Sequence, residues 1–280
     1  MVLTRKDKNI KLITTLIIAV VALLFISPLL WMISSSLKRP YEVFEQPFHW
    51  IPKEVMWSNY AEVWWGASVT MFRSYWNTMQ IVIFSVAGSL IFASMAAYAF
   101  AKIRFVGKNV VFMIFLSSMM IPGQVTIIPR FMLFKTMGLY NSLWSIILPG
   151  LFSATAIFML RQFYMGLPDD LMEAAKIDGA GHMRIFVQIM LPLTKAALVS
   201  LMILSFISNW NEYLSPLIFL TKENLYTVAQ CVRWWMLEDG GNEYGMAMAA
   251  ATSAIIPVVI LFISCQKYFV EGIATSGVKG

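Results

Sequence analysis

Six apolar runs, each long enough to cross a lipid bilayer, constrain this chain more than any other feature. They cover residues 12–32, 78–101, 110–129, 144–163, 196–219 and 246–264. A helix needs roughly 20 mainly apolar residues to cross a hydrocarbon core about 30 Å thick. Hydrophobic residues make up 59% of the 280 and charged residues only 13%, more apolar surface than a soluble domain could bury. We therefore predict an all-α, polytopic membrane protein with six transmembrane helices in a single transmembrane domain over residues 1–280.

The basic residues indicate the orientation, because cytoplasmic loops of membrane proteins are rich in Lys and Arg. With the N-terminus inside, 13 of the 21 basic residues fall on the cytoplasmic side, where the net charge is +7 against −1 outside. We therefore expect both termini, the 164–195 loop and the 265–280 tail to be cytoplasmic. Since the basic residues form no clustered stripe, we expect no nucleic-acid partner. The first run is too long for a signal peptide, so we expect a retained anchor.

The polar segment between the fourth and fifth runs predicts the start of a short helix. Pro168 suits a first helical turn, and Asp169 or Asp170 can cap the free N–H groups there. Asp170 and Glu173 have the spacing of a capping box, with Asp in place of the usual Ser or Thr.

A glycine then predicts a turn into a second short helix. Ala174 and Ala175 favour a helix and leave one face nearly bare of side chains. Gly179 can supply the positive φ that ends a helix, and a second helix follows over about residues 182–190. These residues alone are equally compatible with an ordinary amphipathic connector between two spans.

The spacing of this segment resembles the cytoplasmic EAA loop of ABC-importer permeases. Glu173-Ala174-Ala175 is followed by Gly179, Ile189 and Leu191-Pro192 at the positions of that loop. The flanks are similar to the smaller permease subunit of maltose-type carbohydrate importers, in Tyr98–Phe105, Phe158–Phe163 and Gly277–Gly280. The similarity runs from about Asn77 to the C-terminus and, more loosely, through the first apolar run.

The resemblance implies a permease subunit of an ABC importer, in the cell (inner) membrane of a bacterium or archaeon, that translocates a sugar or oligosaccharide. In the family the first loop helix sits in a cleft of an ATPase, a helix-in-groove contact. The implied coupling residues are Glu173, Ala174, Ala175, Asp178, Gly179, Ala180, Leu191 and Pro192. The implied partners are a second, non-identical permease, two cytoplasmic ATP-binding subunits, an extracytoplasmic solute-binding protein and membrane lipid. ATP and Mg would be used by the ATPases, and we expect this chain to bind no cofactor.

Polar residues within two of the runs are candidates for a substrate pathway. They are Asn209, Trp210, Asn211 and Glu212 in the fifth run and Gln124 and Thr126 in the third. An acidic group at mid-membrane costs roughly 2.5–3.5 kcal/mol on insertion scales unless it faces protein or water. Amides and an aromatic ring can recognise sugar hydroxyls and ring faces. A hydrogen-bonded kink, a run that ends before Glu212, or simple core and lipid packing would explain the same residues.

Small residues recur at every fourth position of the second run, at Ser85, Ser89, Ala93, Ala97 and Ala101. In lipid such a row lets two helix backbones approach closely. The neighbour that fills this groove could belong to the same chain or to another subunit.

The chain carries no signature of an enzyme or of its own energy source. It contains no phosphate-binding G-x-x-x-x-G-K-[ST] motif and no H-E-x-x-H metal motif, and it shows no intramembrane Asp/Glu/His series of the kind that proton-coupled carriers use. We therefore predict no catalytic residues and no metal site, with a partner supplying the work. A glycerophosphate-type or other polar solute is an alternative cargo, although the one cation in the runs, Arg161, lies at the expected cytoplasmic end of the fourth run and not at mid-membrane. A self-contained secondary carrier is a further alternative.

Overall fold

The computed structural model describes residues 5–47, 49–237 and 243–277, so the end of the Gly277–Gly280 motif lies outside the described residues. Within these ranges all regular elements are helices, which confirms the predicted all-α class. The chain divides into two compact units, Met1–Met71 with Cys231–Ile255 and Phe72–Gln230 with Ile256–Gly280.

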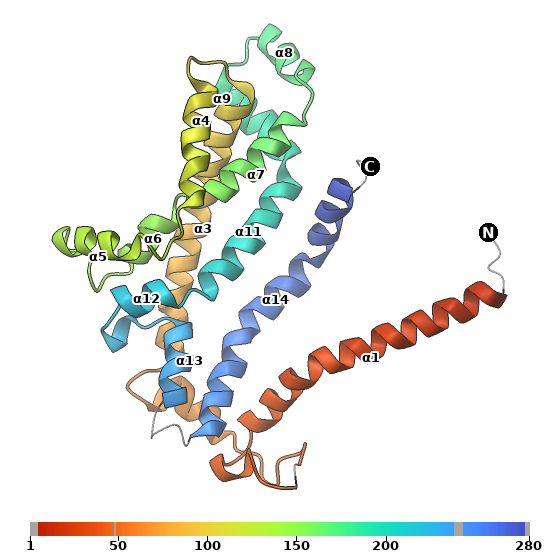
Figure 1. The fold of residues 1–280 in the computed structure, drawn as a ribbon, viewed down its shortest axis with the longest axis vertical. Coiled ribbons are helices and arrows are strands. Elements are labelled where there is room, and N and C mark those ends of the chain that lie inside the picture. Colours follow the sequence, from red (N-terminus) through yellow and green to blue (C-terminus); the bar gives the residue numbers. More distant parts are fainter. Residues whose placement is uncertain (1–4, 48, 238–242, 278–280) are drawn as a thin grey trace. The chain divides into compact units, whose positions relative to one another are not determined.

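Four segments of the described chain are helical, long and apolar enough to cross a membrane (Figure 1). They are Asn9–Ser36 within α1 (Arg5–Ser36), Met71–Lys102 (α3), Trp144–Met165 (α6, Trp144–Gly150, with α7, Ala154–Met165) and Tyr244–Gln266 within α14 (Tyr244–Gly277). The first, second, fourth and sixth predicted runs are thereby confirmed as helices of membrane length. A fifth is present if His182–Leu193 and Lys195–Trp210, which meet at 76°, are counted together.

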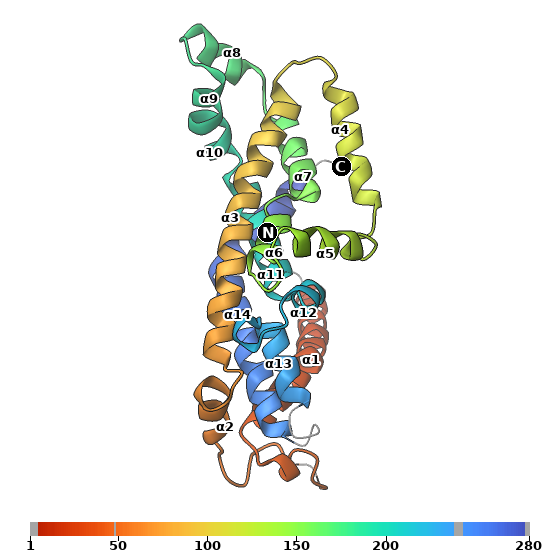
Figure 2. The same ribbon diagram turned by 90° about the vertical axis from the view of Figure 1, so that its left-hand side faces the viewer.

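The third predicted run, 110–129, is wrong as a single helix. The helix α4 (Lys108–Ser117) passes into the short 3₁₀ helix η3 (Ser118–Met120) and then stops. Ile121 is extended, with φ −86° and ψ 113°, because the ring of a following proline disfavours helical geometry. The next helix, α5 (Ile127–Thr136), runs across α3 and α4 instead of along them in both ribbon views (Figures 1 and 2).

The fifth predicted run, 196–219, also breaks before its end. Its helix α11 (Lys195–Trp210) stops at Trp210, and α12 (Leu214–Phe219) follows after three residues. Glu212 lies in this break, and its Oε1 accepts the backbone N–H of Ser215 at 2.9 Å. The carboxylate thereby satisfies one of the free N–H groups at the start of α12. Two further elements complete this region: η5 (Glu223–Leu225) and α13 (Val228–Leu237).

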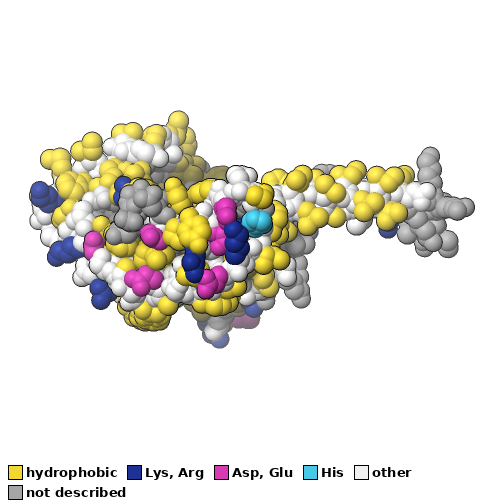
Figure 3. Space-filling view, turned by 90° about the horizontal axis from the view of Figure 1, so that it is seen from below, with side chains coloured by type: hydrophobic (Ala, Val, Ile, Leu, Met, Phe, Trp, Pro, Cys, Tyr) yellow, Lys and Arg dark blue, Asp and Glu magenta, His cyan; other side chains and the backbone are white. Residues whose placement is uncertain are grey.

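The first unit contains α1 and the short helices that follow it. These are η1 (Pro40–Glu42), α2 (Ser58–Ala61) and the π-helical η2 (Glu62–Gly66). Asn59 Nδ2 donates to the carbonyl oxygens of Ser36 and Lys38, both at 2.9 Å, and so fixes α2 to the end of α1. Hydrophobic side chains cover α1 along its length (Figure 3), and its most apolar window is unburied within the chain. A helix that is apolar all round is suited to lipid contact.

The row of small residues on α3 packs against helices of its own chain. Ser85, Ser89, Ala93 and Ala97 are each at most 3% exposed. The two alanines belong to a buried cluster that includes Leu160 of α7 and Leu201 of α11. At Ala93 and Ala97, therefore, the neighbours belong to the same chain and lie within the second unit.

We predict that Gly150→Ala destabilises the protein, because the added Cβ would lie 2.5 Å from Ser85 Oγ. Overpacking of this kind costs typically about 1–3 kcal/mol and should lower the unfolding midpoint of the detergent-solubilised chain. Gly123→Ala is the matched control, since a Cβ there meets nothing within 4 Å. Ser85→Gly should recover the midpoint of Gly150→Ala. An unchanged midpoint in Gly150→Ala would contradict the close approach of α6 and α3.

Candidate functional site

The polar segment after α7 folds into a bent pair of helices, which we call the elbow (residues 170–190). It consists of α8 (Asp170–Ile177), α9 (His182–Ile185) and the π-helical η4 (Phe186–Met190), followed by α10 (Leu191–Leu193). Gly179 makes the turn with φ +79°, so the predicted positive φ is confirmed, as is the second short helix. Both ribbon views place α8 beyond the C-terminal end of α3, with α9 beside that end (Figures 1 and 2).

The inner face of the elbow is buried against the long helices. Its buried side chains are Met172, Ala175, Ile185, Phe186 and Met190. They form one cluster with Tyr98 of α3 and Tyr164 of α7, and the Tyr98 ring lies 5.3 Å from that of Phe186. Full burial of a large apolar side chain contributes about 1.5–3 kcal/mol. The elbow is therefore attached to the helix bundle through its own hydrophobic core.

The outer face of the elbow is free in this chain. Glu173, Ala174 and Asp178 are exposed, and the apolar Ile177 is 86% exposed. Of the two alanines expected to leave a bare face, only Ala174 lies on the free surface, because Ala175 packs inward beside Met172. Gly179 and Pro192 are exposed, and Ala180 and Leu191 are half-buried. The predicted coupling residues thus divide between the two faces.

An ion pair connects the start of α8 to the end of α3. Lys102 Nζ donates to Asp169 Oδ1 and to the Leu167 carbonyl oxygen, both at 2.6 Å. This bond lowers the pKa of the Asp169 carboxyl below its ordinary value. The capping prediction is wrong here, because α8 begins at Asp170 and Asp169, in the cap position, uses its carboxylate for Lys102 instead of the helix N–H groups. The Asp170–Glu173 capping box is excluded by the same helix boundary, since Asp170 is already inside the helix.

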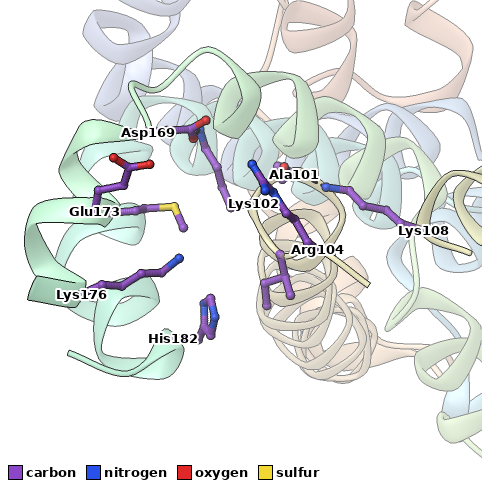
Figure 4. Close-up of a pocket in the computed structure, with 10 residues that line it drawn as sticks. Ala101, Lys102, Arg104, Lys108, Asp169, Glu173, Lys176 and His182 are labelled. Carbon is purple, nitrogen blue, oxygen red and sulfur yellow. Dashed lines mark hydrogen bonds and ion pairs between the residues drawn. The ribbon is translucent and has the colours of Figure 1, made fainter. Parts of the chain in front are cut away.

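A polar cavity of about 440 Å³ lies between the end of α3 and the elbow (Figure 4). Its charged lining consists of Lys102, Arg104, Lys108, Asp169, Glu173 and Lys176. Four of these six side chains are basic, so the cavity carries an excess of positive charge.

Three of the residues predicted for a substrate pathway, Asn209, Trp210 and Asn211, have their partners in α11 itself. Asn209 Nδ2 and Asn211 Nδ2 donate to carbonyl oxygens four residues earlier, at 2.8 and 2.9 Å. Trp210 is 2% exposed and stacks on Phe206. This geometry corresponds to the hydrogen-bonded kink that the sequence left as an alternative. Gln124 and Thr126 are exposed in the break after η3, and among the described residues no hydrogen bond joins them to residues 209–212.

The apolar pattern of the sequence gives no sign that a cation, Arg130, lies near the break after α11. Arg130 follows directly after the third apolar run and lies on α5. Its Nη2 donates to Ser215 Oγ at 3.0 Å, and its guanidinium carbon lies 5.0 Å from the ring centroid of Phe219. Arg130 and Glu212 thus hold the same residue, Ser215, from two sides. Arg130 reaches α12 only because the third apolar run is broken. The apolar pattern of the sequence does not reveal this break.

Residues 89–275 match the family described as "Binding-protein-dependent transport system inner membrane component". The chain belongs to this family. It is therefore a transport permease and not an enzyme, as the resemblance indicated, and it is a multi-pass membrane protein.

This permease is similar to curated proteins over nearly its whole length. It is 34% identical to the arabinooligosaccharides transport system permease protein AraQ of Bacillus subtilis, over 95% of each chain. It is 32% identical to the sn-glycerol-3-phosphate transport system permease protein UgpE of Pectobacterium atrosepticum, over 99% of each. A chain in the crystal structure of a bacterial ABC transporter involved in the import of the acidic polysaccharide alginate matches with a TM-score of 0.83 and 25% identity. That match covers 96% of this permease and 99% of the other chain.

We predict that the Asp169 carboxyl of the permease titrates below its ordinary range and that Lys102→Met moves its midpoint upward. Because the folded-state pKa is lowered, the bond adds stability above the ordinary pKa, and this stability is lost as the pH falls through the lowered value. The carboxyl carbon shift in a ¹³C-labelled sample measures the midpoint directly. Asp170→Asn, which changes a neighbouring exposed carboxylate, should leave it in place. An Asp169 midpoint that is insensitive to Lys102→Met would show that the bond does not form.

Proposed function

We propose that this permease is one of two non-identical membrane subunits of an ABC importer that translocates a sugar or oligosaccharide. In this proposal an external binding protein delivers the cargo, and two cytoplasmic ATPases drive the transport. One observation carries the proposal: the elbow has a buried face on the helix bundle and a free face for a partner. An element built in this way can transmit a displacement from another polypeptide to the membrane helices.

The free face of α8 suits a groove on an ATPase. Glu173 offers a carboxylate, Ala174 allows close approach, and Leu171 and Ile177 supply exposed apolar surface. A short helix that presents apolar and charged side chains on one surface is recognised in helix-in-groove contacts. ATP and Mg act in the partner ATPases, and this permease binds no cofactor of its own.

The proposed topology has six crossings, with both termini and the elbow in the cytoplasm. The distribution of basic residues supports this orientation. In this arrangement α4 and α11 cross the membrane as shorter helices, continued by the broken segments that follow them. Non-helical backbone at membrane depth is tolerated where it is buried in protein or lines a water-filled cavity. The two compact units then act as parts of one permease domain.

The relatives and Arg130 support two candidate cargoes. The name of AraQ refers to arabinooligosaccharides, which are neutral, and the other importer is involved in the import of alginate, an acidic polysaccharide. An oligosaccharide is therefore the leading candidate for the cargo. A glycerophosphate-type solute is the second candidate, because UgpE is similar over the same length. Arg130, which lies at the break beside Glu212, supplies a cation for an anionic cargo.

We predict that Gly179→Val lowers cargo-stimulated ATP hydrolysis by the importer reconstituted with its partners in vesicles. A side chain in the left-handed region costs roughly 1–2 kcal/mol, which corresponds to about a 5- to 30-fold change in an equilibrium. Within this chain the effect comes from the strain, because a Cβ at Gly179 meets nothing within 4 Å, and the added bulk acts only at the contact with the ATPase. Gly181→Val is the matched control, since Gly181 has ordinary backbone geometry and equal open space.

The same vesicles test the function and the cargo. Arabino-oligosaccharides, uronate oligosaccharides and glycerol 3-phosphate are compared, each with a cognate binding protein. Uptake should require ATP and both ATPases. Transport by the permease pair without any nucleotide-hydrolysing subunit would overturn the proposed function, and normal coupling in Gly179→Val would remove the proposed role of the elbow turn.

A further inference from the structure

The cavity beside the elbow holds more positive charge than the chain itself neutralises. Lys102 is paired with Asp169, but among the described side chains no carboxylate lies within ion-pair distance of Arg104, Lys108 or Lys176. Lys108 Nζ instead donates to the Ala101 carbonyl oxygen at 3.0 Å. Cations gathered in this way repel one another, so an anion that enters the cavity relieves the repulsion.

Two of these cations are shared with a second hollow. Arg104 and Lys108 also line a neighbouring cavity of about 330 Å³, together with the connection between α3 and α4. Figure 4 shows Lys108 extending toward the end of α3, while Arg104 extends toward the side of the cavity where Lys102 and Asp169 lie. Gly107, with φ +78°, turns the chain between them. The turn therefore places two basic side chains, from residues close together in the sequence, at one site.

Apolar surface lies directly beside this basic site. Val106, at the tip of the connection, is fully exposed, and Val110, on the first turn of α4, is 62% exposed. A basic hollow flanked by exposed apolar side chains, between the end of the membrane-length helix α3 and the start of the shorter apolar helix α4, matches a ligand with an anionic head and an apolar body. Basic pockets between transmembrane helices on the cytoplasmic side bind anionic lipid head groups by this combination.

We propose that this cavity binds the phosphate group of an anionic phospholipid, with Arg104 and Lys108 as its principal ligands. The opposite wall of the cavity is formed by Glu173 and Lys176 of α8. A bound head group therefore also contacts the elbow and holds α8 against the α3–α4 connection. The site stands on this cavity alone and is independent of which cargo is carried. A soluble phosphate compound offers the same anionic chemistry without the apolar body.

The test is lipid retention by the purified importer, complete with its partner permease and ATPases. Phosphatidylglycerol or phosphatidylcholine is titrated into the detergent-solubilised complex, and bound lipid is counted by native mass spectrometry. Each Lys or Arg near a lipid surface contributes an attraction equivalent to about a fivefold change in binding. We expect Arg104→Gln with Lys108→Gln to weaken retention of phosphatidylglycerol about 25-fold. Lys135→Gln with Lys222→Gln removes two exposed charges outside the cavity and should change nothing.

The arms of the experiment separate the sources of the anion. Inorganic phosphate at millimolar concentration should fail to displace the lipid. If it binds without any retention of phosphatidylglycerol, the lipid assignment is overturned in favour of a soluble phosphate. Equal retention in both double variants overturns the site altogether. Retention by the permease pair but not by the complete importer would show that an acidic segment of an ATPase fills the cavity, which also overturns the proposal. None of these outcomes depends on transport, so the proposed function is tested separately.

Discussion

The buried contact between the elbow and the helix bundle is the interaction on which the rest of this structure depends. Met172 and Ala175 turn one side of α8 inward, and Met190 continues the same cluster from η4. Protein interiors are close-packed and resist compression, so a displacement applied to the free side of α8 is passed to α3 and α7. Without this core, α8 would be a tethered helix whose movement need not reach the membrane segments.

Inside the bundle, small residues allow the helices to pack closely, and polar side chains stabilise the break after α11. Lipid offers helices no hydrophobic reason to associate, so the close approach of α3 to its neighbours rests on packing at positions such as Ser85 and Ala97. Where α11 stops, the free N–H of Ser215 is satisfied by Glu212, and Arg130 binds the hydroxyl of the same residue. The interruption of the helix is therefore stabilised by specific bonds, and it brings a cation and a carboxylate to the break.

Much of this arrangement was predictable from local signals. Length and apolar composition were enough for the four long helices, and Gly179 was identified because few other residues adopt a positive φ. The failures have a common cause, which is that the deciding partner is distant in sequence. Asp169 was expected to cap α8, but Lys102, 67 residues earlier, takes its carboxylate. The difference between Ala174 and Ala175 likewise depends on the direction in which α8 packs, which their identical side chains do not reveal.

The most direct test of the account is a pair of spin labels across the contact between the elbow and the bundle. Met95→Cys on α3 and Met183→Cys on α9 place the labels at exposed positions, with Cys231 and Cys265 replaced by serine. Pulsed electron paramagnetic resonance then gives their separation in the complete importer, without nucleotide and with ATP trapped in the ATPases. The account predicts the same distance in both states, because the elbow and α3 move as one body. A distance that changes when ATP is bound would show that the elbow slides over the bundle, and it would contradict transmission through the buried face.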